Sequence, residues 1–485
     1  MQHELKKDFD QRFRLRLLFS WAWWSPRPIT LVEQFTLFPS PFSRTYFEQA
    51  YNVQTAFNLL YFRVMRDYEF LREVYQGIIQ HNHLLAKAFD IMDQVHSEGI
   101  KQPITLLIQR ADYMICEKNS NDNDVSKTYE LKQIEVNGTS VGGLASSELT
   151  TKLHKRILSK LGLNLANSIE NPTLSNTVEA LYKAWTQFNN PKGIILLIDK
   201  MCYRDNESNL IKEQLVGKYK INVFVLALQH CVKRLTLDEN DFSLRLDQRH
   251  DVAVVFNQEN MLNKRKNLMK VRRIIERSTA IKAPSLIAAL AHSKIVQQVL
   301  SEPGMVERFF PNPEEAPLIK AIRDTYAKMW RIEENENNEQ FSEIIERVKK
   351  QPNNFVMKLT EYALWNAFNK DEVKKIYLGE EILETLSNFE ADKRRAYILM
   401  EKLRPKSVKN HIVWAEDEEG SSGGDFFEEV TPELGIFGTL LGNIANGEVL
   451  HNAQIGHKLR TKLASANACG IENVKTAYDT AYLVD

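Results

Sequence analysis

Two oxygen-bearing side chains end a predicted strand just before a glycine-containing turn. Glu135 and Asn137 stand two residues apart in "QIEVNGTSVGG", and alternate residues of a strand share one face. A carboxylate and an amide oxygen that converge at a strand end suit Mg²⁺, which prefers oxygen ligands and commonly takes others from phosphate groups. A polar strand end that runs into glycines is also typical of an ordinary turn. The pair alone therefore leaves a metal site and a simple turn both open.

Two lysines occupy positions where a packed chain has little need of charge. Lys294 follows Ser293 at a predicted helix start, and Lys358 interrupts the apolar strand "FVMKL". A lysine can lay its aliphatic stem along apolar surface and bring its ammonium group to water, which would explain either position without a function. The alternative is that both ammonium groups bind phosphate oxygens as point charges. Spacing along the sequence does not decide between the two explanations.

The segment "LRTK" near the C-terminus extends this set of charges. Its Arg460 and Lys462 are two residues apart, and a guanidinium group such as that of Arg460 can clamp a carboxylate through two hydrogen bonds. The oxygen pair and the two lysines together are what an Mg-nucleotide site needs. Sequence spacing cannot show that they meet.

The elements that would position these residues are mixed helices and strands. Apolar residues recur at helical spacing over residues 47–97, which predicts packed helices. "ITLLIQ" and "LKQIEV" are predicted strands on either side of a polar loop. Between residues 191 and 292, the apolar runs "GIILLIDK", "INVFVLAL" and "DVAVVF" alternate with the helical segment "NLIKEQLVGKY". This alternation predicts an α/β subdomain with a parallel sheet.

The rest of the chain predicts two further helices and a second sheet. Ser285 and Ser293 are candidate N-caps of successive helices. "FVMKL", "YILMEKL", "ELGIFGTLLGNI" and "VLHNAQIGHKL" are predicted strands of that second sheet. The acidic, glycine- and serine-rich run "EDEEGSSGGDFFEE" is predicted to be a mobile surface loop.

The composition limits the partners that such a protein can have. The 485 residues, enough for two or three lobes, include 63 Lys and Arg against 63 Asp and Glu. A net charge of +0 gives no field that would attract nucleic acid or an anionic membrane. The four cysteines are far apart with no Cys-x-x-Cys pair, which favours the reducing cytoplasm over a disulfide framework or a zinc site. No signal peptide is expected, and no apolar run reaches the ~20 residues of a membrane span.

Nine segments along most of the chain carry a family resemblance when they are taken in order. They are "FTLFPSPF", "FEQAYNVQTAFNLL", "ADYM", "LKQIEVN", "GGLAS", "SKIVQQVLSEPGM", "YILMEKL", "ELGIFG" and "IGHKLRTK". Together they resemble the eukaryotic glutathione synthetase family. The resemblance implies an ATP-grasp fold, a homodimer, and an Mg²⁺-dependent ligase that uses ATP to join γ-glutamylcysteine to glycine through an acyl phosphate. That chemistry rests on positioning and charge neutralisation and needs no protein nucleophile.

The resemblance also implies roles for individual residues. Glu135 and Asn137 would hold Mg²⁺, with Glu135 also close to the ATP phosphates, while Lys294 and Lys358 would bind phosphate oxygens. The other matching positions would line the nucleotide or the peptide: Met400, Glu401, Lys402 and Leu403 at the adenine, Glu433 and Lys462 in the nucleotide pocket, and Arg110 and Arg460 on the γ-glutamyl substrate.

The match breaks off after Lys358. There the family runs Pro-Gln-Arg-Glu-Gly-Gly-Gly-Asn-Asn, in which the glutamate is a third metal ligand and the glycines let backbone amides cover the phosphates. Here Tyr362 takes the place of the glutamate, and Glu361 comes one residue early, which in a strand is the opposite face unless the backbone bulges or turns helical. Leu364, Trp365 and Phe368 at helical spacing predict a helix in place of a glycine cover.

The substrate side of the match is altered as well. The family's substrate-binding asparagine and glutamine fall on Arg204 and Ser208, and its arginine falls on Gln258. Ser140 is a doubtful match in a shortened serine turn. Residues 468–470 replace an Asp-Gly-Gly loop and so lack an acidic nucleotide contact.

Two functional hypotheses follow. The first is an ATP-dependent ligase with three parts: an N-terminal helical region with the metal-ligand strand at 1–190, an α/β substrate-binding subdomain at 191–292, and an ATP-grasp nucleotide-binding region at 293–485. The second is a catalytically weak paralogue that keeps the fold and nucleotide binding and acts as a partner subunit or regulator. A wrongly joined exon after Lys358 is a further, non-biological explanation of the altered segment.

Overall fold

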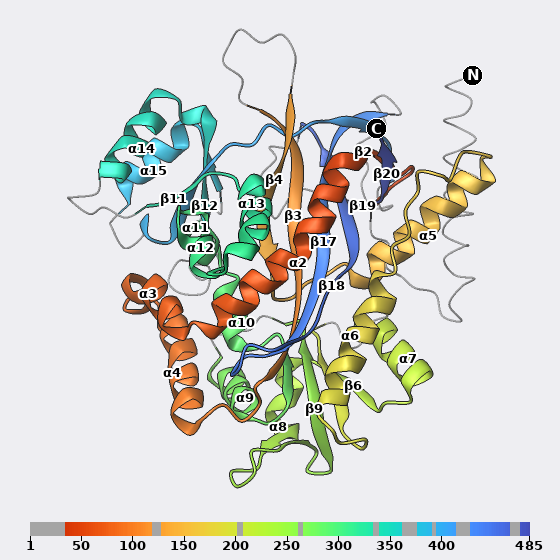
Figure 1. Cartoon of the computed structure of the whole chain (residues 1–485), viewed down its shortest axis with the longest axis vertical. Helices are drawn as coiled ribbons and strands as arrows, with labels where there is room; N and C mark the ends of the chain where they lie inside the picture. The colour runs from red at the N-terminus through yellow and green to blue at the C-terminus, as the bar shows by residue number, and fades with distance from the viewer. Residues whose placement is uncertain are drawn as a thin grey trace.

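One large sheet runs through the molecule, and helices cover both of its faces (Figure 1). The computed structural model describes residues 34–118, 128–200, 207–259, 265–332, 339–360, 376–389, 394–413, 427–465 and 476–485. Within these ranges the large sheet has fourteen strands. Ten follow one path, in the order β16 (Ile412–Val413), β1 (Phe35–Thr36), β19 (Ala477–Asp479), β18 (Val449–Leu463), β17 (Glu428–Asn443), β3 (Ile104–Glu117), β10 (Ile281–Ala283), β9 (His250–Asn257), β5 (Ile194–Ile198) and β6 (Val223–Leu226).

Strand β3 joins an antiparallel half of this sheet to a parallel half. One edge of β3 pairs antiparallel with β17, and the other edge pairs with β4 (Tyr129–Asn137) and, near its start, in parallel with β10. From β10 the strands β9, β5 and β6 continue in parallel. The parallel sheet predicted for residues 191–292 is therefore confirmed. The short strands β15 (Val408–Asn410), β7 (Leu235–Leu237) and β8 (Leu244–Leu246) branch from the main path.

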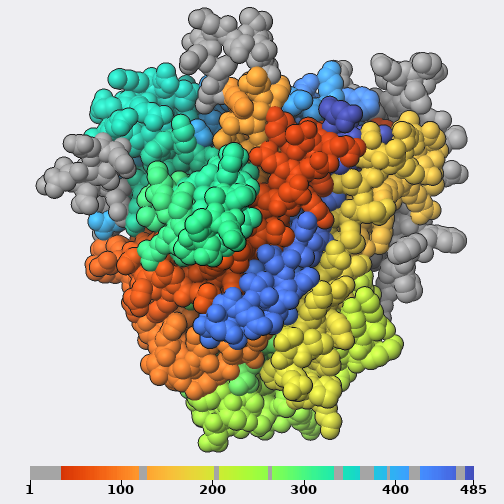
Figure 2. All heavy atoms as spheres, viewed as in Figure 1, coloured from red at the N-terminus to blue at the C-terminus, as the bar shows by residue number. Residues whose placement is uncertain are grey.

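Three apolar layers hold helices against the sheet. The largest core packs Phe57 and Leu60 of α2 (Arg44–Arg66) against Leu107 of β3 and Ile436 of β17. The helices that share this core are α3 (Tyr68–Ile79), α4 (His83–Glu98), α10 (Leu286–Ala291), α11 (Lys294–Ser301), α12 (Met305–Arg308) and α13 (Ala316–Thr325). The same view in spheres shows α2 at the surface between α13 and the α5–α6 region (Figure 2).

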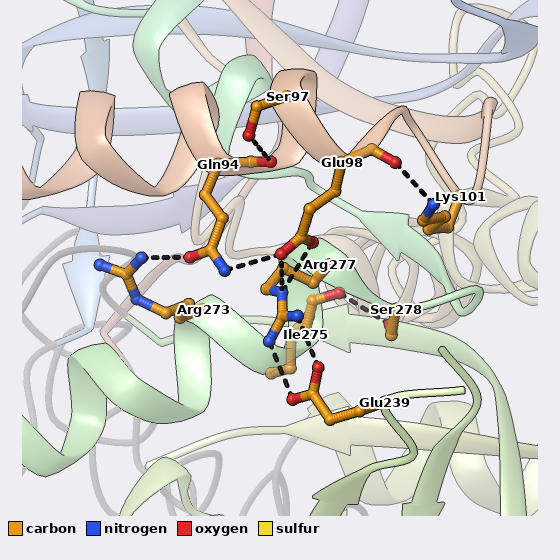
Figure 3. A network of polar contacts seen from close by, with 9 residues as sticks. All are labelled: Gln94, Ser97, Glu98, Lys101, Glu239, Arg273, Ile275, Arg277 and Ser278. Carbon is orange, nitrogen blue, oxygen red and sulfur yellow. Dashed lines mark hydrogen bonds and ion pairs between the residues drawn. The ribbon is translucent and has the colours of Figure 1, made fainter. Parts of the chain in front are cut away.

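Two further cores cover the rest of the sheet. One packs α5 (Leu144–Lys160), α6 (Thr173–Gln187) and α7 (Glu207–Tyr219) on β5, β9 and the ends of β3 and β17. The other packs α8 (Leu228–Arg234) and α9 (Lys266–Arg277) on the opposite face of β5 and β9. An ion pair between Arg277 and Glu98 also ties α9 to α4, and Arg277 forms a second ion pair with Glu239, which follows β7 (Figure 3).

A separate four-stranded antiparallel sheet forms the lobe at the upper left of Figure 1. Its order is β11 (Met329–Arg331), β14 (Tyr397–Glu401), β12 (Phe355–Leu359) and β13 (Ile376–Leu378), and it carries α14 (Glu339–Lys350) and α15 (Glu380–Asn388). Only two of the four strands predicted for a second sheet belong to it. That prediction was wrong for "ELGIFGTLLGNI" and "VLHNAQIGHKL", which form β17 and β18 of the large sheet because β17 pairs with β3 over ten positions. Strands β2 (Ser40–Ser43) and β20 (Ala481–Val484) form a small parallel pair of their own.

Most locally encoded elements match the sequence prediction. The helices expected over 47–97 are α2, α3 and α4, and "ITLLIQ" and "LKQIEV" lie in the antiparallel pair β3 and β4. The side chains of Ser285 and Ser293 accept hydrogen bonds from the backbone N–H groups of Ala288 and Val296, so both predicted N-caps are confirmed. The predicted helix after Lys358 and most of the acidic loop lie outside the described residues. In the part of the chain that the structure describes, no helix has both the length and the apolar content to cross a bilayer.

Candidate active site

The candidate site begins where β3 and β4 lie side by side. Glu135 and Asn137 of β4 are opposite Asp112 and Arg110 of β3. The Asn137 Nδ2 donates a hydrogen bond to the Glu135 Oε1 at 3.2 Å. The two side chains therefore share one face of the strand, as the sequence predicts.

Asp112 organises this part of the site, although the sequence analysis did not single it out. Its carboxylate accepts hydrogen bonds from the Nε and Nη2 of Arg110 at 2.6 and 2.8 Å, and from the Nδ2 of Asn137 at 2.8 Å. Asp112 is 1% exposed and Arg110 is 8% exposed. Burial lowers the pKa of Arg110, but the charge of Asp112 outweighs it and the pKa lies above its usual value. Arg110 is therefore a charged side chain that is already held by an internal carboxylate.

A glycine in β17 makes room for this buried pair. A Cβ at Gly435 would lie 2.5 Å from the Oδ1 of Asp112 and 2.6 Å from the Cδ of Arg110. Gly435 is directly opposite Asp112 in the sheet, so the side chains of Arg110 and Asp112 lie against the glycine. Gly435 of "ELGIFG" thus has a steric function. This function becomes apparent only when the pairing of β17 with the distant strand β3 is known.

Glu135 is the point at which distant parts of the chain meet. The Nζ of Lys294, at the start of α11, lies 3.3 Å from the Oε2 of Glu135. Burial would raise the pKa of Glu135, but the positive charges of Lys294, Lys358 and Arg460 and a hydrogen bond from Asn137 hold the pKa well below its usual value. The carboxylate is therefore ionised, and cations from α11, β12 and β18 act on it together.

Arg460 and Lys462 of β18 share one carboxylate. Arg460 lies directly opposite Glu433 of β17, and its Nη2 donates to the Glu433 Oε1. The Nζ of Lys462 lies 3.8 Å from the Oε2 of the same side chain. The carboxylate that Arg460 contacts is thus an internal one, and the structure joins these three predicted site residues into one group, in which Glu433 and Lys462 are buried and Arg460 is partly exposed.

Lys358 is a buried residue of β12, with only 6% of its surface exposed. Its side chain shares a face of the small sheet with Val356, which is opposite Met400 of β14. These two apolar side chains belong to a cluster with Ala327 and Ile376. The ammonium group of a lysine suits the phosphates of a nucleotide, and an apolar surface beside it suits the base.

The segment predicted to border the adenine follows this apolar cluster. Leu403 packs on the cluster, and the N–H of Lys402 donates to the carbonyl of Asn354 at 2.8 Å. The Oε1 of Glu401 accepts from the N–H of Lys328 at 2.9 Å. These contacts fix the segment on the small sheet.

Comparisons with known proteins identify the family of this chain. The family model described as "Eukaryotic glutathione synthase, ATP binding domain" matches residues 26–483. The chain belongs to the eukaryotic glutathione synthase family. Glutathione synthetase of Rattus norvegicus is 32% identical over 95% of this chain and 92% of its own length, and that of Homo sapiens is 31% identical over 93% and 90%. The apo structure of a glutathione synthetase-like effector from Globodera pallida superposes with a TM-score of 0.71, at 33% identity over 93% of this chain and 90% of that one.

Membership in the glutathione synthase family agrees with the fold. The architecture is α/β of the ATP-grasp type, with a helical N-terminal region and an α/β subdomain, as the sequence predicts. The recognition of a divergent family member from its motifs is confirmed as well.

The residues present fit the Mg²⁺ that the glutathione synthase family implies. Glu135 supplies an ionised carboxylate. The amide nitrogen of Asn137 is engaged by Asp112 and Glu135, while its Oδ1 accepts no hydrogen bond from the described residues. Within the described ranges, no three His, Cys, Asp or Glu side chains gather closely enough to hold a metal ion, so two oxygen ligands would need phosphate oxygens to complete the shell.

Gln297 of α11 is a second residue that the sequence analysis missed. Its Oε1 accepts from the N–H of Val136 at 3.0 Å, and its Nε2 donates to the carbonyl of Val136 at 2.9 Å. Val136 stands between Glu135 and Asn137, so Gln297 fixes the backbone that presents the side chains of both candidate ligands. A glutamine inside a helix gives no sequence signal for this function, because the contact joins residues 161 positions apart.

Several residues at which the chain departs from the family lie outside the described residues. These are Glu361, Tyr362, Leu364, Trp365, Phe368, Arg204 and residues 468–470. Of the others, Ser208 donates its hydroxyl to the Oδ2 of Asp199 at 2.6 Å, and the N–H of Gln258 donates to the carbonyl of Ile198 at 2.8 Å. Ser140 has a positive φ of 49°, in the turn before α5.

Proposed function

We propose that this protein is an ATP- and Mg²⁺-dependent ligase that condenses γ-glutamylcysteine with glycine through an acyl phosphate. The observation that carries the proposal is the convergence on Glu135. The ionised carboxylate of Glu135 accepts a hydrogen bond from Asn137 and pairs with Lys294, and the charges of Lys358 and Arg460, from two further elements, also lower its pKa. Similarity to glutathione synthetases over more than nine-tenths of the chain supports the substrate assignment.

Each residue has a physical reason for its proposed role. Glu135 and Asn137 hold Mg²⁺, which when bound neutralises phosphate charge and orients the γ-phosphoryl group. Lys294 and Lys358 bind phosphate oxygens, and the phosphates then compete with Glu135 for the ammonium group of Lys294. Phosphoryl transfer makes the peptide carboxyl group an acyl phosphate, and the amine of glycine then displaces phosphate to form the amide. These side chains act by position and charge.

The remaining predicted residues surround this centre. The proposal assigns residues 400–403 to the edge of the adenine, and Glu433 and Lys462 to the nucleotide pocket. Arg110, whose Nη1 also donates to the carbonyl of Gly142 at 3.0 Å, and Arg460 contact the γ-glutamyl substrate with the N–H groups that their internal contacts leave over. We further propose a cytoplasmic homodimer with three parts, at 1–190, 191–292 and 293–485, which binds neither nucleic acid nor membrane.

A product assay with variants tests this function. Purified protein is incubated with Mg-ATP, γ-glutamylcysteine and glycine, and phosphate release and the tripeptide are both quantified. We expect turnover that falls at least 100-fold in Lys358→Met and in Glu135→Ala, because each change removes a charge from the phosphate site. The matched control is Lys320→Met, which removes an exposed lysine on α13. Turnover that survives both site variants would contradict the site assignment.

The same assay separates the ligase from the catalytically weak paralogue. A protein that binds Mg-ATP in calorimetry but forms no tripeptide is the paralogue, and the ligase assignment is then rejected. Tripeptide formation with another amine in place of glycine changes the acceptor and leaves the reaction class unchanged.

A further inference from the structure

Lys458 of β18 is a cation of the candidate site that the sequence analysis did not single out. It lies opposite Gly435 of β17, which is opposite Asp112, which in turn is opposite Glu135. Residues paired across neighbouring strands point to the same face. Lys458 therefore lies on the same face of the sheet as Glu135 and at the other end of one row of four strands.

The surroundings of Lys458 hold its ammonium group in place without neutralising it. The Nζ lies 4.6 Å from the centre of the Tyr478 ring and 3.0 Å from the point where a Cβ on Gly143 would stand. No described residue forms an ion pair or hydrogen bond with this ammonium group. By contrast, Arg110, Arg460 and Lys294 are each in contact with a carboxylate. Lys458 is thus the cation of this face, among those described, that has a ring contact but no carboxylate partner.

The nearby helix end does not offer a competing place for an anion. Glu207 of α7 accepts hydrogen bonds from the backbone N–H groups of Gly143, Ala145 and Ser146 at 2.9 to 3.2 Å. The start of α5 is therefore already occupied by an internal carboxylate. An anionic ligand on this face of the sheet would therefore meet Lys458 before the backbone amides at the start of α5.

We propose that Lys458 binds the carboxylate of the peptide substrate that is remote from the reacting one. This assignment rests on the proposed function and names the residue that selects a dicarboxylate peptide. Three strand spacings of ~4.8 Å put the backbone of Lys458 about 14 Å from that of Glu135, and the two side chains shorten that gap. A γ-linked dipeptide reaches about 10 Å, or roughly three residue lengths of ~3.3 Å. Its reacting carboxyl group can thus lie beside Glu135 while its other carboxylate reaches Lys458.

Burial gives the interaction a pH dependence. It lowers the pKa of Lys458 to about 8, with Arg110 and Arg460 acting in the same direction and Glu207 and Asp112 opposing them. Among the described residues, the charged and titratable groups that face Lys458 include those four and Tyr478. The ammonium form binds the carboxylate, so affinity for the peptide is expected to fall as the pH rises past about 8. An arginine at this position stays charged and removes that fall.

Calorimetry with defined probes tests the proposal. The full chain is loaded with Mg²⁺ and a non-hydrolysable ATP analogue and titrated with γ-glutamylcysteine or with the same peptide amidated at its γ-glutamyl α-carboxyl group. Lys458→Met should weaken binding of the free dipeptide about 10- to 100-fold and leave binding of the amidated peptide and of nucleotide unchanged. Lys458→Arg should restore binding and abolish its loss at high pH. Lys320→Met is the control for a lost exposed lysine.

The outcomes separate this proposal from the proposed function. Equal dipeptide affinity in the wild type and Lys458→Met overturns the role of Lys458, even if the protein makes tripeptide. If dipeptide binding depends on Lys458 but no tripeptide forms, the role of Lys458 is supported and the ligase function is rejected. A wild type that does not bind the dipeptide at millimolar concentration overturns the role of Lys458 as well.

Discussion

Replacing Asp112 with asparagine should destabilise the protein and weaken metal binding at the same time. The Asp112 carboxylate holds both Arg110 and Asn137, and it is buried. An amide in its place removes the negative charge and turns one acceptor into a donor. The guanidinium group of Arg110 then loses the one carboxylate of the described residues that it contacts and keeps only the more distant charges of Glu135 and Glu433, and Asn137 loses a charged acceptor for its Nδ2.

The structure sets the size of both effects. Removing one partner of a buried ion pair costs about 3–5 kcal/mol of unfolding free energy. An unfolding entropy of about 2.1 cal/mol/K per residue gives about 1 kcal/mol/K for 485 residues, so Tm should fall by about 3–5 °C. Loss of a partner that orients a metal ligand typically weakens metal binding about 10- to 100-fold, and we expect that range for Mg²⁺ in the presence of nucleotide.

Scanning calorimetry and an Mg²⁺ titration with a non-hydrolysable ATP analogue measure the two effects. The matched control is Asp247→Asn, since Asp247 also receives two hydrogen bonds from one arginine, Arg234, but both side chains are more than a third exposed. That change should cost far less stability than Asp112→Asn, because solvent screens an exposed ion pair. The reasoning is refuted if both variants shift Tm equally, or if Asp112→Asn keeps the metal affinity of the wild type.

Three further predictions concern packing and charge. Gly435→Ala should cost about 1–3 kcal/mol of unfolding free energy in urea denaturation, because the new Cβ forces Arg110 and Asp112 apart. The control is Gly217→Ala in α7, which should be neutral or stabilising because its Cβ would meet no atom within 4 Å. Glu135 has a lowered pKa, so its contribution to stability is complete above the usual carboxyl range and is lost as pH falls. Wild type should therefore lose more stability than Glu135→Gln between pH 5.5 and 3.5, and parallel losses would contradict this assignment. Arg277→Met should cost about 1–2 kcal/mol of unfolding free energy, because it breaks the contacts with Glu98 and Glu239 in Figure 3. The affinity for nucleotide should stay unchanged, and an altered affinity would count against a purely structural role.

What the sequence predicts well is what short stretches of chain determine. The common face of Glu135 and Asn137 follows from strand alternation, and the helix starts at Ser285 and Ser293 follow from capping by a serine hydroxyl group. Each of these signals lies within four residues. None depends on which element packs against which.

What the sequence does not predict depends on strand pairing between distant segments. The strand "ELGIFG" joins the large sheet because it pairs with β3, more than three hundred positions earlier in the chain. The functions of Asp112 and Gly435 appear only once that register is known. The same holds for Lys358, because its 6% exposure follows from the packing around the small sheet and not from the sequence of its strand. Burial and register are properties of the assembled fold, and short-range patterns do not contain them.

Helix α11 explains how the phosphate cover could change while the rest of the site stayed in place. It packs against β4 of the large sheet and against β11 and β14 of the small sheet. From this position Lys294 contacts Glu135, and Gln297 holds the backbone of Val136. The proposed metal ligands and Lys294, a proposed phosphate-binding lysine, thus have positioning contacts that do not involve residues 361–375. Substitutions in that segment should therefore alter phosphoryl transfer more than Mg²⁺ binding, because the two depend on separate parts of the chain.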